Sequence, residues 1–348
     1  MRVAINGFGR IGRLALRSTL KRHPEARVVA INDLADANAN AHLFKYDSNY
    51  GPFPGSVTLD GAWMTVDGQS IEVLSERDWS KLDWDGRGVD LVIESTGVGR
   101  KRELASLHLQ AGAKKVLISA PADDADFMVV LGVNHQSYDP GKHHIVSNAS
   151  CTTNGLAPAV KVVHDTFRIV KGQMTTVHSY TNTQHTLDLF AKDLRDARAA
   201  AMNIVPADTG AARAIGKVIP ELKGKLDGAA YRVPTPTVSI VEFVVLLGRP
   251  ATAEEINDAL RAAAEGPMKG ILDVSDELLV SMDLKQNEHS SIVDASSTMV
   301  VAGDLAKVAA WYDNEWGYAC RLGDMAEYML AAEPAGARKA SAASVAGT

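Results

Sequence analysis

The amino-terminal segment carries a glycine-rich turn between an apolar run and a helical pattern. The run at residues 3–5 leads into Gly7, Gly9 and Gly12, which have the spacing G-x-G-x-x-G. A second apolar run, RVVAIND, ends at Asp33. A strand, a glycine turn, a helix and a second strand ending in an acid are typical of a dinucleotide-binding βαβ unit. The glycines let the backbone approach a pyrophosphate, and the start of the helix offers N–H groups to it.

Asp33 indicates which dinucleotide this unit prefers. Its carboxylate would accept hydrogen bonds from the hydroxyls of the adenine ribose, and it would repel a 2′-phosphate. We therefore expect NAD as the cofactor rather than NADP.

A second constraint is the segment SNASCTTN around Cys151, between the predicted strand HHIVSN and a helix with an apolar stripe. Ser150 is the expected N-cap, which places Cys151 in the first turn. Unpaired backbone N–H groups and the helix dipole favour an anion there, so we expect increased thiolate character. Cys151 is the candidate nucleophile. Cys320, in the helical pattern CRLGDMAEYML, is expected to serve packing.

Length and composition exclude several classes of function. With 348 residues, the chain is long enough for two domains with substantial cores. A net charge of −6 without blocks of like charge argues against nucleic acid or an anionic membrane as the main partner. From the sequence we expect no signal peptide, and no apolar stretch reaches membrane-spanning length. Two cysteines make no disulfide framework, so we expect a cytoplasmic protein. No metal site is expected.

The apolar pattern changes along the chain and predicts an α/β protein of two parts. In the first half, short apolar runs alternate with helical segments, which is typical of a Rossmann-type parallel sheet with helices on both faces. A hairpin is expected at Asp67 and Gly68. The longer runs GQMTTVHSYT, AAYRVPTPTVSIVEFVVLLG and SSIVDASSTMVV predict a second, α+β domain with a mixed or antiparallel sheet and helices on one face. Thr252 and Glu255 predict a capping box for the helix EEINDALRAAA.

From about Arg2 to the Met325 region, the chain resembles the bacterial-like, type I phosphorylating glyceraldehyde-3-phosphate dehydrogenases. The resemblance is carried by NGFGRIGR, IND, KYDS, ESTG, SNASCTTN, TTVHSYTN, ADTGAA, RVPTPTVS and WYDNEWGY. It implies a glycolytic oxidoreductase that assembles as a homotetramer. Such an enzyme oxidises glyceraldehyde 3-phosphate with NAD and inorganic phosphate to 1,3-bisphosphoglycerate through a cysteine thioester.

With the resemblance, the expected domain bounds become specific. Residues 1–149 are expected to form the NAD-binding domain and residues 150–313 the catalytic domain, with Cys151 at their junction. Residues 314–332 would form a helix that packs back on the first domain, as in the family. The low-complexity tail 333–348 has too little apolar surface to fold alone and is expected to be disordered.

The resemblance also implies roles for individual residues. Cys151 attacks the aldehyde, and His178 acts as the base that takes the hemithioacetal proton as hydride leaves. The backbone N–H of Cys151 and a protonated His178 would stabilise the oxyanion. Two phosphate subsites are implied, for the substrate phosphate and for the attacking ion. The first is lined by Thr181 and Arg232, and the second by Ser150, Thr152, Thr209 and Gly210.

Further residues are implied for the cofactor. They belong to the glycine turn, the surroundings of the adenine, the nicotinamide ribose and the carboxamide. In addition to Gly7, Gly9, Gly12 and Asp33, these residues are Arg10, Ile11, Arg77, Thr96, Ser119, Asn314 and Tyr318. Two departures from the family stand out. Asp196 occupies a position where many bacterial relatives have arginine, and Arg195 and Arg198 are the candidates to compensate. Phe190 follows Leu189 where NAD-dependent members often have Leu-Pro, in a loop that lies between subunits in the family.

Two other functions fit parts of the sequence. Erythrose-4-phosphate dehydrogenase shares SNASCTTN, and Asp208 and the LAD after Asp33 lean toward it. It typically lacks the threonine of HSYTN and the glycine of DTG, whereas this chain keeps Thr181 and Gly210. A catalytically silent binding or regulatory protein on the same scaffold is the second alternative, and the intact Cys151 and His178 argue against it.

Overall fold

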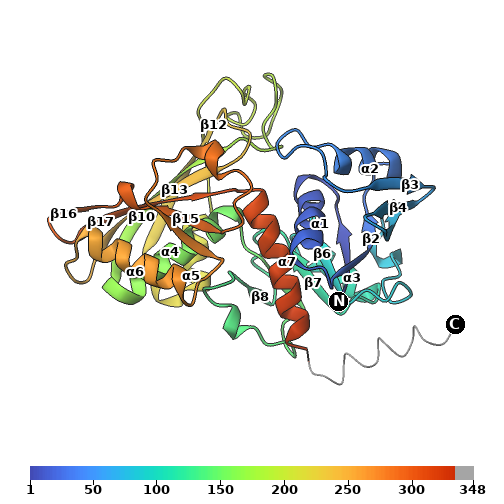
Figure 1. Cartoon of the computed structure of the whole chain (residues 1–348), viewed down its shortest axis with the longest axis horizontal. Coiled ribbons are helices and arrows are strands. Elements are labelled where there is room, and N and C mark those ends of the chain that lie inside the picture. The colour runs from blue at the N-terminus through green and yellow to red at the C-terminus, as the bar shows by residue number, and fades with distance from the viewer. Residues whose placement is uncertain (334–348) are drawn as a thin grey trace. The chain divides into compact units, whose positions relative to one another are not determined.

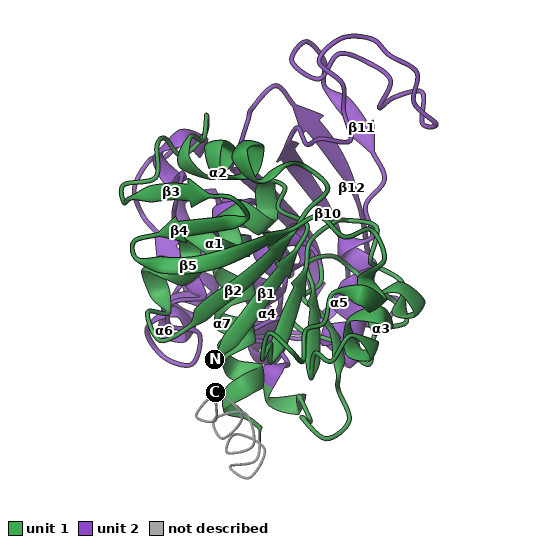
Figure 2. Cartoon of the chain, turned by 90° about the vertical axis from the view of Figure 1, so that its right-hand side faces the viewer, with its two compact units in different colours: residues 1–129, 136–149, 319–348 green, residues 130–135, 150–318 purple. Residues whose placement is uncertain are grey.

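The computed structural model describes residues 1–333. The prediction of a disordered tail lies outside these residues, apart from Glu333. The chain divides into two compact units (Figure 2). Of the described residues, unit 1 contains 1–129, 136–149 and 319–333, and unit 2 contains 130–135 and 150–318.

Unit 1 is built on one large sheet with the predicted Rossmann-type pattern. Among the described residues its nine strands have the order β3-β4-β5-β2-β1-β6-β7-β9-β8, and all neighbours are parallel except β3-β4 and β4-β5. The strands are β1 (Arg2–Asn6), β2 (Arg27–Asn32), β3 (Val57–Asp60), β4 (Trp63–Val66), β5 (Gln69–Leu74), β6 (Leu91–Glu94), β7 (Lys115–Ile118), β8 (Phe127–Met128) and β9 (Ile145–Ser147). The expected hairpin is confirmed, because Asp67 and Gly68 join β4 to β5 with φ angles of 47° and 80°.

The helices of unit 1 are α1 (Arg10–Arg22), α2 (Ala37–Lys45), α3 (Arg102–Gln110) and most of α7 (Trp316–Ala331) (Figure 1). Helix α1 packs on α7, since the Ser18 hydroxyl donates to the carbonyl of Ala319 at 3.2 Å. The carboxyl ends of the parallel strands β1, β2 and β6 lie side by side in the sheet, and the glycine turn follows the carboxyl end of β1.

Unit 2 contains a mixed sheet of the predicted kind. Within the described chain the order is β11-β12-β10-β13-β17-β15-β14, with β16 paired to β17, and only β10-β12 and β14-β15 are parallel. The strands are β10 (Ile169–Ser179), β11 (Val205–Ala207), β12 (Leu226–Val233), β13 (Ser239–Leu247), β14 (Leu272–Ser275), β15 (Ser291–Asp294), β16 (Met299–Val301) and β17 (Leu305–Tyr312). Helices α4 (Cys151–Phe167), α5 (Ala211–Val218) and α6 (Ala253–Glu265) pack against it. Residues along β13 alternate between buried and half-buried, as a sheet covered on one face requires.

In unit 2 the structure confirms the predicted helix cap and corrects one predicted strand. The capping box at Thr252 and Glu255 is confirmed at the start of α6. The run AAYRVPTPTVSIVEFVVLLG is two strands, β12 and β13, rather than one. Pro234 and Pro236 interrupt it, because proline has no N–H to donate to a sheet.

Candidate active site

Cys151 is the first residue of α4. The predicted cap is confirmed, because the Ser150 hydroxyl accepts a hydrogen bond from the backbone N–H of Thr153 at 2.9 Å. The side chain of Cys151 is half-buried, whereas Cys320 is fully buried. Cys151 is therefore the less buried of the two cysteines, and it lies at a helix N-terminus that favours negative charge.

His178 lies near the end of β10 and faces the thiol. Its Nε2 atom is 3.5 Å from the Sγ of Cys151, and its Nδ1 atom is 2.7 Å from the carbonyl oxygen of Ser179. A carbonyl only accepts and the guanidinium of Arg232, which also faces Nδ1, only donates, so Nδ1 can serve one of these two partners. In the tautomer with the proton on Nδ1, the lone pair of Nε2 faces the sulfur. The arrangement can move a proton from the thiol to the imidazole.

Arg232 completes this cluster from the neighbouring strand. Residues His178 and Arg232 are in register on the parallel strands β10 and β12. The guanidinium contacts Nδ1 of His178 and donates to the carbonyl of Ser179 at 3.1 Å. A permanent positive charge therefore lies beside both the thiol and the imidazole.

Burial sets the protonation states of the pair. Burial raises the pKa of the Cys151 thiol, although the Arg232 charge and hydrogen bonds from Thr152 lower it. Burial and the Arg232 charge lower the pKa of His178 to about 3. Both shifts favour a neutral thiol beside a neutral imidazole. Desolvation thus opposes the thiolate character expected of Cys151 at this helix start, which stays a prediction.

Tyr312, at the end of β17, supports this cluster and was missed by the sequence analysis. Its buried hydroxyl lies 3.0 Å from the Thr152 hydroxyl and 2.9 Å from that of Thr176, and its ring meets the His178 ring edge-on. A Cβ atom added to Gly155 would lie 2.8 Å from the Tyr312 ring, so only glycine lets α4 approach so closely. The motif WYDNEWGY was the available signal.

The candidate phosphate residues fall in three places in unit 2. Ser150 and Thr152 lie at the start of α4, where the hydroxyl of Thr152 is turned toward Tyr312. Gly210 is the N-cap of α5, and the hydroxyl of Thr209 accepts from the N–H of Ala211 at 3.2 Å. Thr181 hydrogen-bonds to Thr183 at 3.0 Å. Within residues 1–333, no hydrogen bond joins Thr181 or Thr209 to the Cys151, His178 and Arg232 cluster.

The loop that contains Asp196 is exposed. Arg198 forms an ion pair with Asp188 at 3.0 Å, so its charge is already neutralised. Arg195 is exposed, and its backbone N–H is held by Asp193 at 2.9 Å. Arg195 is thus the better candidate to replace the missing arginine.

In unit 1 the glycine turn has the close packing that a dinucleotide requires. A Cβ atom on Gly7 would lie 2.4 Å from the backbone nitrogen of Thr96, and one on Gly12 would lie 2.1 Å from the carbonyl oxygen of Gly7. Gly9 is the N-cap of α1, with no side-chain cap and open space where a Cβ would stand. The turn therefore presents the bare helix start that fits a pyrophosphate.

Side chains around this turn are held by the protein. Asp33 accepts from the N–H groups of Phe8 and Ala35 at 2.7 and 2.9 Å, which fixes its carboxylate at the end of β2. The guanidinium of Arg10 forms an ion pair with Asp47 at 2.5 Å. Arg10 and Ile11, in the first turn of α1, can therefore serve the pyrophosphate through their backbone.

The other cofactor candidates are distributed over both units. In unit 1, Arg77 is exposed after β5, and the backbone N–H of Ser119 donates to the carbonyl of Glu94 at 2.9 Å. In unit 2, the hydroxyls of Ser179 and Ser239 both donate to Oδ1 of Asn314 at 2.9 Å. The amide nitrogen of Asn314 is thereby oriented as a donor. Tyr318 is buried in the first turn of α7.

Comparison with known proteins identifies the family. Residues 1–102 match the NAD binding domain of glyceraldehyde 3-phosphate dehydrogenase, and residues 150–314 match its C-terminal domain. The chain belongs to the glyceraldehyde-3-phosphate dehydrogenase family. It is 56% identical to glyceraldehyde-3-phosphate dehydrogenase 1 of Bacillus subtilis over 329 residues, which cover 94% of this chain and 98% of the relative. Identity is 57%, with the same coverage, to the protein of that name from Geobacillus stearothermophilus. It is 52% over 330 residues to that from Streptomyces coelicolor, again with 94% and 98% covered.

Family membership makes residues 1–102 part of an NAD-binding domain and the chain an NAD-dependent oxidoreductase. In the part of the chain that the structure describes, no group of three or more His, Cys, Asp or Glu side chains is arranged to hold a metal ion. None of the helices between residues 1 and 333 has the length and apolar character to span a bilayer.

Proposed function

We propose that this chain is a phosphorylating glyceraldehyde-3-phosphate dehydrogenase. It converts glyceraldehyde 3-phosphate, NAD and inorganic phosphate to 1,3-bisphosphoglycerate through a thioester on Cys151. The observation that carries the proposal is the 3.5 Å contact between a half-buried thiol and Nε2 of a buried, neutral histidine. Residues 1–149 serve the cofactor and residues 150–313 serve the chemistry, with 314–332 as a C-terminal helix that packs back on the cofactor domain.

The first step joins the sulfur to the aldehyde. The Sγ atom of Cys151 bonds to the carbonyl carbon while Nε2 of His178 takes the thiol proton, which passes to the developing oxyanion. The product is a neutral hemithioacetal. The lowered pKa of His178 keeps Nε2 unprotonated at neutral pH, and efficient proton transfer requires this pKa to rise toward neutral as negative charge develops on the sulfur and the substrate.

The second step oxidises the hemithioacetal. Its hydroxyl proton moves to Nε2 of His178 as the hydride leaves the same carbon, and a thioester remains on Cys151. NAD supplies the hydride acceptor. Asn314 is suited to orient the carboxamide, because two serine hydroxyls fix its amide.

In the third step an oxygen of inorganic phosphate attacks the thioester carbon and the C–S bond breaks. The thiol is restored with a proton from His178, and the reaction as a whole releases one proton to solvent. The helix starts at Ser150 and Gly210 are suited to hold the attacking ion with Thr152 and Thr209, through backbone N–H groups. Arg232 and Thr181 are suited to the phosphate of the substrate.

We further infer a homotetramer in the cytoplasm. The loop between β10 and β11 exposes large apolar side chains, with Leu187 at 72%, Phe190 at 87% and Met202 at 80% of their surface. Exposed apolar side chains gathered on one loop favour contact with another protein surface, and a second copy of this chain is the proposed partner.

One assay tests the function. The purified chain should produce NADH from glyceraldehyde 3-phosphate only when phosphate or arsenate is present. Erythrose 4-phosphate serves as the competing substrate. Full turnover without phosphate, with release of the free acid, would rule out the phosphorylating reaction, and faster turnover of erythrose 4-phosphate would favour the alternative enzyme.

A further inference from the structure

A buried carboxylate lies beneath the cofactor edge of unit 1. Glu94 is the last residue of β6 and is 2% exposed. Its Oε2 atom accepts from Nδ2 of Asn6 at 2.5 Å and lies 3.2 Å from Nε2 of His108. Its Oε1 atom accepts from the backbone N–H of Thr96 at 2.9 Å and from the Thr96 hydroxyl.

The protonation of His108 follows from its other partner. The indole N–H of Trp84 can only donate, and it donates to Nδ1 of His108 at 3.1 Å. Nε2 of His108 therefore carries the proton and donates to Glu94. Four donors then fill the four acceptor positions of the Glu94 side chain, so an amide N–H in place of one of its oxygens would face another donor.

The same chain of hydrogen bonds continues under the neighbouring strand ends. Nδ2 of Asn32 donates to Oδ1 of Asn6 at 2.7 Å, and Oδ1 of Asn32 accepts from the N–H of Glu76 at 2.8 Å. We refer to Trp84, His108, Glu94, Asn6 and Asn32 as the Glu94 network. Asn6 precedes Gly7 and Asn32 precedes Asp33, so two members are adjacent in sequence to cofactor candidates.

Glu94 also shapes the loop that follows it. The Thr96 hydroxyl donates to Glu94 and accepts from the N–H groups of Val98 and Gly99 at 3.2 and 3.3 Å. That hydroxyl is therefore committed to the protein. A Cβ atom on Gly99 would lie 2.5 Å from the carboxyl carbon of Glu94, so the loop wraps closely around the carboxylate.

We propose that Glu94 is a positioning residue for NAD. Its carboxylate holds the loop at residues 96–99 against the glycine turn. The backbone of Thr96 in this loop lies against Gly7 of the turn. Thr96 then acts through the place of its backbone rather than through a free hydroxyl. The inference rests on the cofactor site of the proposed function and adds the residue that sets its shape.

The experiment measures NAD binding by calorimetry, without aldehyde or phosphate, for the wild-type chain and Glu94→Gln. The variant keeps the shape of the side chain but places an N–H among donors. We expect NAD to bind at least about tenfold more weakly, as for loss of hydrogen bonds to a charged group. The KM for glyceraldehyde 3-phosphate should change less than about twofold. A general loss of stability would not weaken NAD binding while leaving the KM for the aldehyde nearly unchanged.

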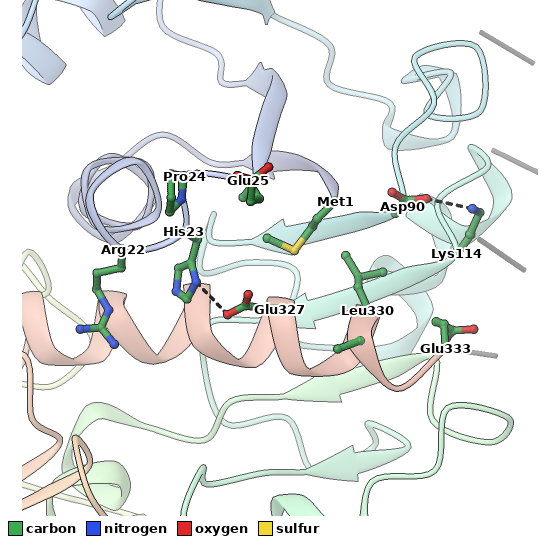
Figure 3. A pocket seen from close by; sticks show the side chains of 12 residues that line it. Met1, Arg22, His23, Pro24, Glu25, Asp90, Lys114, Glu327, Leu330 and Glu333 are labelled. Carbon is green, nitrogen blue, oxygen red and sulfur yellow. Dashed lines mark hydrogen bonds and ion pairs between the residues drawn. The ribbon is translucent and has the colours of Figure 1, made fainter. Parts of the chain in front are cut away.

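The matched control is Asp90→Asn, at the opposite end of the same strand. Asp90 accepts from the N–H of Arg2 at 3.1 Å and pairs with Lys114 at 2.8 Å (Figure 3). Asp90 belongs to a separate pocket of about 400 Å³ at the amino-terminal end of the sheet. This variant should bind NAD as the wild type does. Amide hydrogen exchange at Val98 and Gly99 should be faster in Glu94→Gln and unchanged in the control.

The outcomes separate the hypotheses. Wild-type affinity in Glu94→Gln, or an equal loss in Asp90→Asn, overturns the proposal. A wild-type chain that fails to bind NAD overturns the proposed function instead. If Glu94→Gln does not fold, Thr96→Val takes its place, because it removes one donor from the network at a half-buried loop position. Unchanged NAD affinity in Thr96→Val would then overturn the positioning role.

Discussion

The Sγ atom of Cys151 and the Nε2 atom of His178 are 3.5 Å apart, and the two side chains come from a helix start and a strand end of the same unit. Burial disfavours charge on both side chains, because it raises the pKa of Cys151 and lowers that of His178. A neutral pair becomes reactive when the substrate arrives and the proton can move between the two atoms.

The two cysteines should differ sharply in reactivity. We expect iodoacetamide to label Cys151 much faster than the fully buried Cys320 and to abolish dehydrogenase activity. Peptide mapping after partial labelling measures this. Labelling of Cys320 first, or activity that survives Cys151→Ser, would contradict the mechanism.

The pH dependence of alkylation should follow the raised pKa of Cys151. Because the thiolate is the reactive form and burial raises the thiol pKa, the rate should still be increasing steeply at about pH 10, where an ordinary cysteine is already largely ionised. Initial rates of inactivation between pH 6 and 10, without substrate, measure the profile. A plateau already reached near pH 6 would mean that the thiolate is stabilised in the free protein.

Removal of the base should slow the chemical step. In His178→Asn we expect hydride transfer to fall by about 10²–10⁴, the usual contribution of a general base. Since the His178 pKa is about 3, the wild-type hydride-transfer rate should show no loss near pH 6.5 from protonation of this residue. Single-turnover formation of NADH measures both. Equal rates in the variant and the wild type would assign proton transfer to another group.

Asp33 should govern the choice of cofactor. Its carboxylate is fixed by two backbone N–H groups, so a 2′-phosphate cannot displace it without breaking them. We expect the wild-type enzyme to have a higher kcat/KM for NAD than for NADP. In Asp33→Ala the ratio of these two values should be smaller, mainly because kcat/KM for NADP increases. Equal use of both cofactors by the wild type would mean that the exposed Phe190 outweighs Asp33.

The two phosphate subsites should separate in kinetics. Arg232→Ala should raise the KM for glyceraldehyde 3-phosphate about tenfold or more and affect the KM for inorganic phosphate much less, whereas Thr209→Ala should do the reverse. Initial rates with each substrate varied in turn measure this. Because Arg232 also contacts His178, a fall in kcat is expected for Arg232→Ala as well. Equal effects of both variants on both KM values would argue for one shared anion site.

His23 should make stability depend on pH. It lies 2.9 Å from Asp324 and 2.9 Å from Glu327 of α7, and Figure 3 shows the contact with Glu327. The hydrogen bond to Asp324 raises the pKa of His23. Because folding raises the pKa of His23, its protonation stabilises the folded protein fully below the ordinary histidine pKa of 6.5. This stabilisation is lost as the pH increases through the pKa that His23 has in the folded protein. His23→Asn should therefore destabilise the protein more at pH 6 than at pH 9, by urea unfolding. The exposed His42→Asn is the control, and an equal loss at both pH values would contradict the ion pair.

Much of the fold could be predicted because its signals are local. The glycine turn, the Ser150 cap and the hairpin at Asp67 each depend on a few neighbouring residues, whose φ angles and hydrogen bonds are set within one turn. The candidate nucleophile Cys151 came from the same kind of signal, a thiol at a helix start, whereas His178 was assigned through the resemblance of TTVHSYTN to the family. Their catalytic roles remain predictions.

Burial and long-range pairing were decided by the tertiary structure alone. The sequence indicated a thiolate at Cys151, but desolvation raises its pKa, and the extent of desolvation depends on strands far away in the chain. Tyr312 and Glu94 were not recognised for the same reason. Tyr312 reaches Thr152 only after β17 enters the sheet, and Glu94 meets Asn6 and His108 only when β1, β6 and α3 come together. A sequence states which groups can donate or accept, but only the fold decides which of them meet away from water.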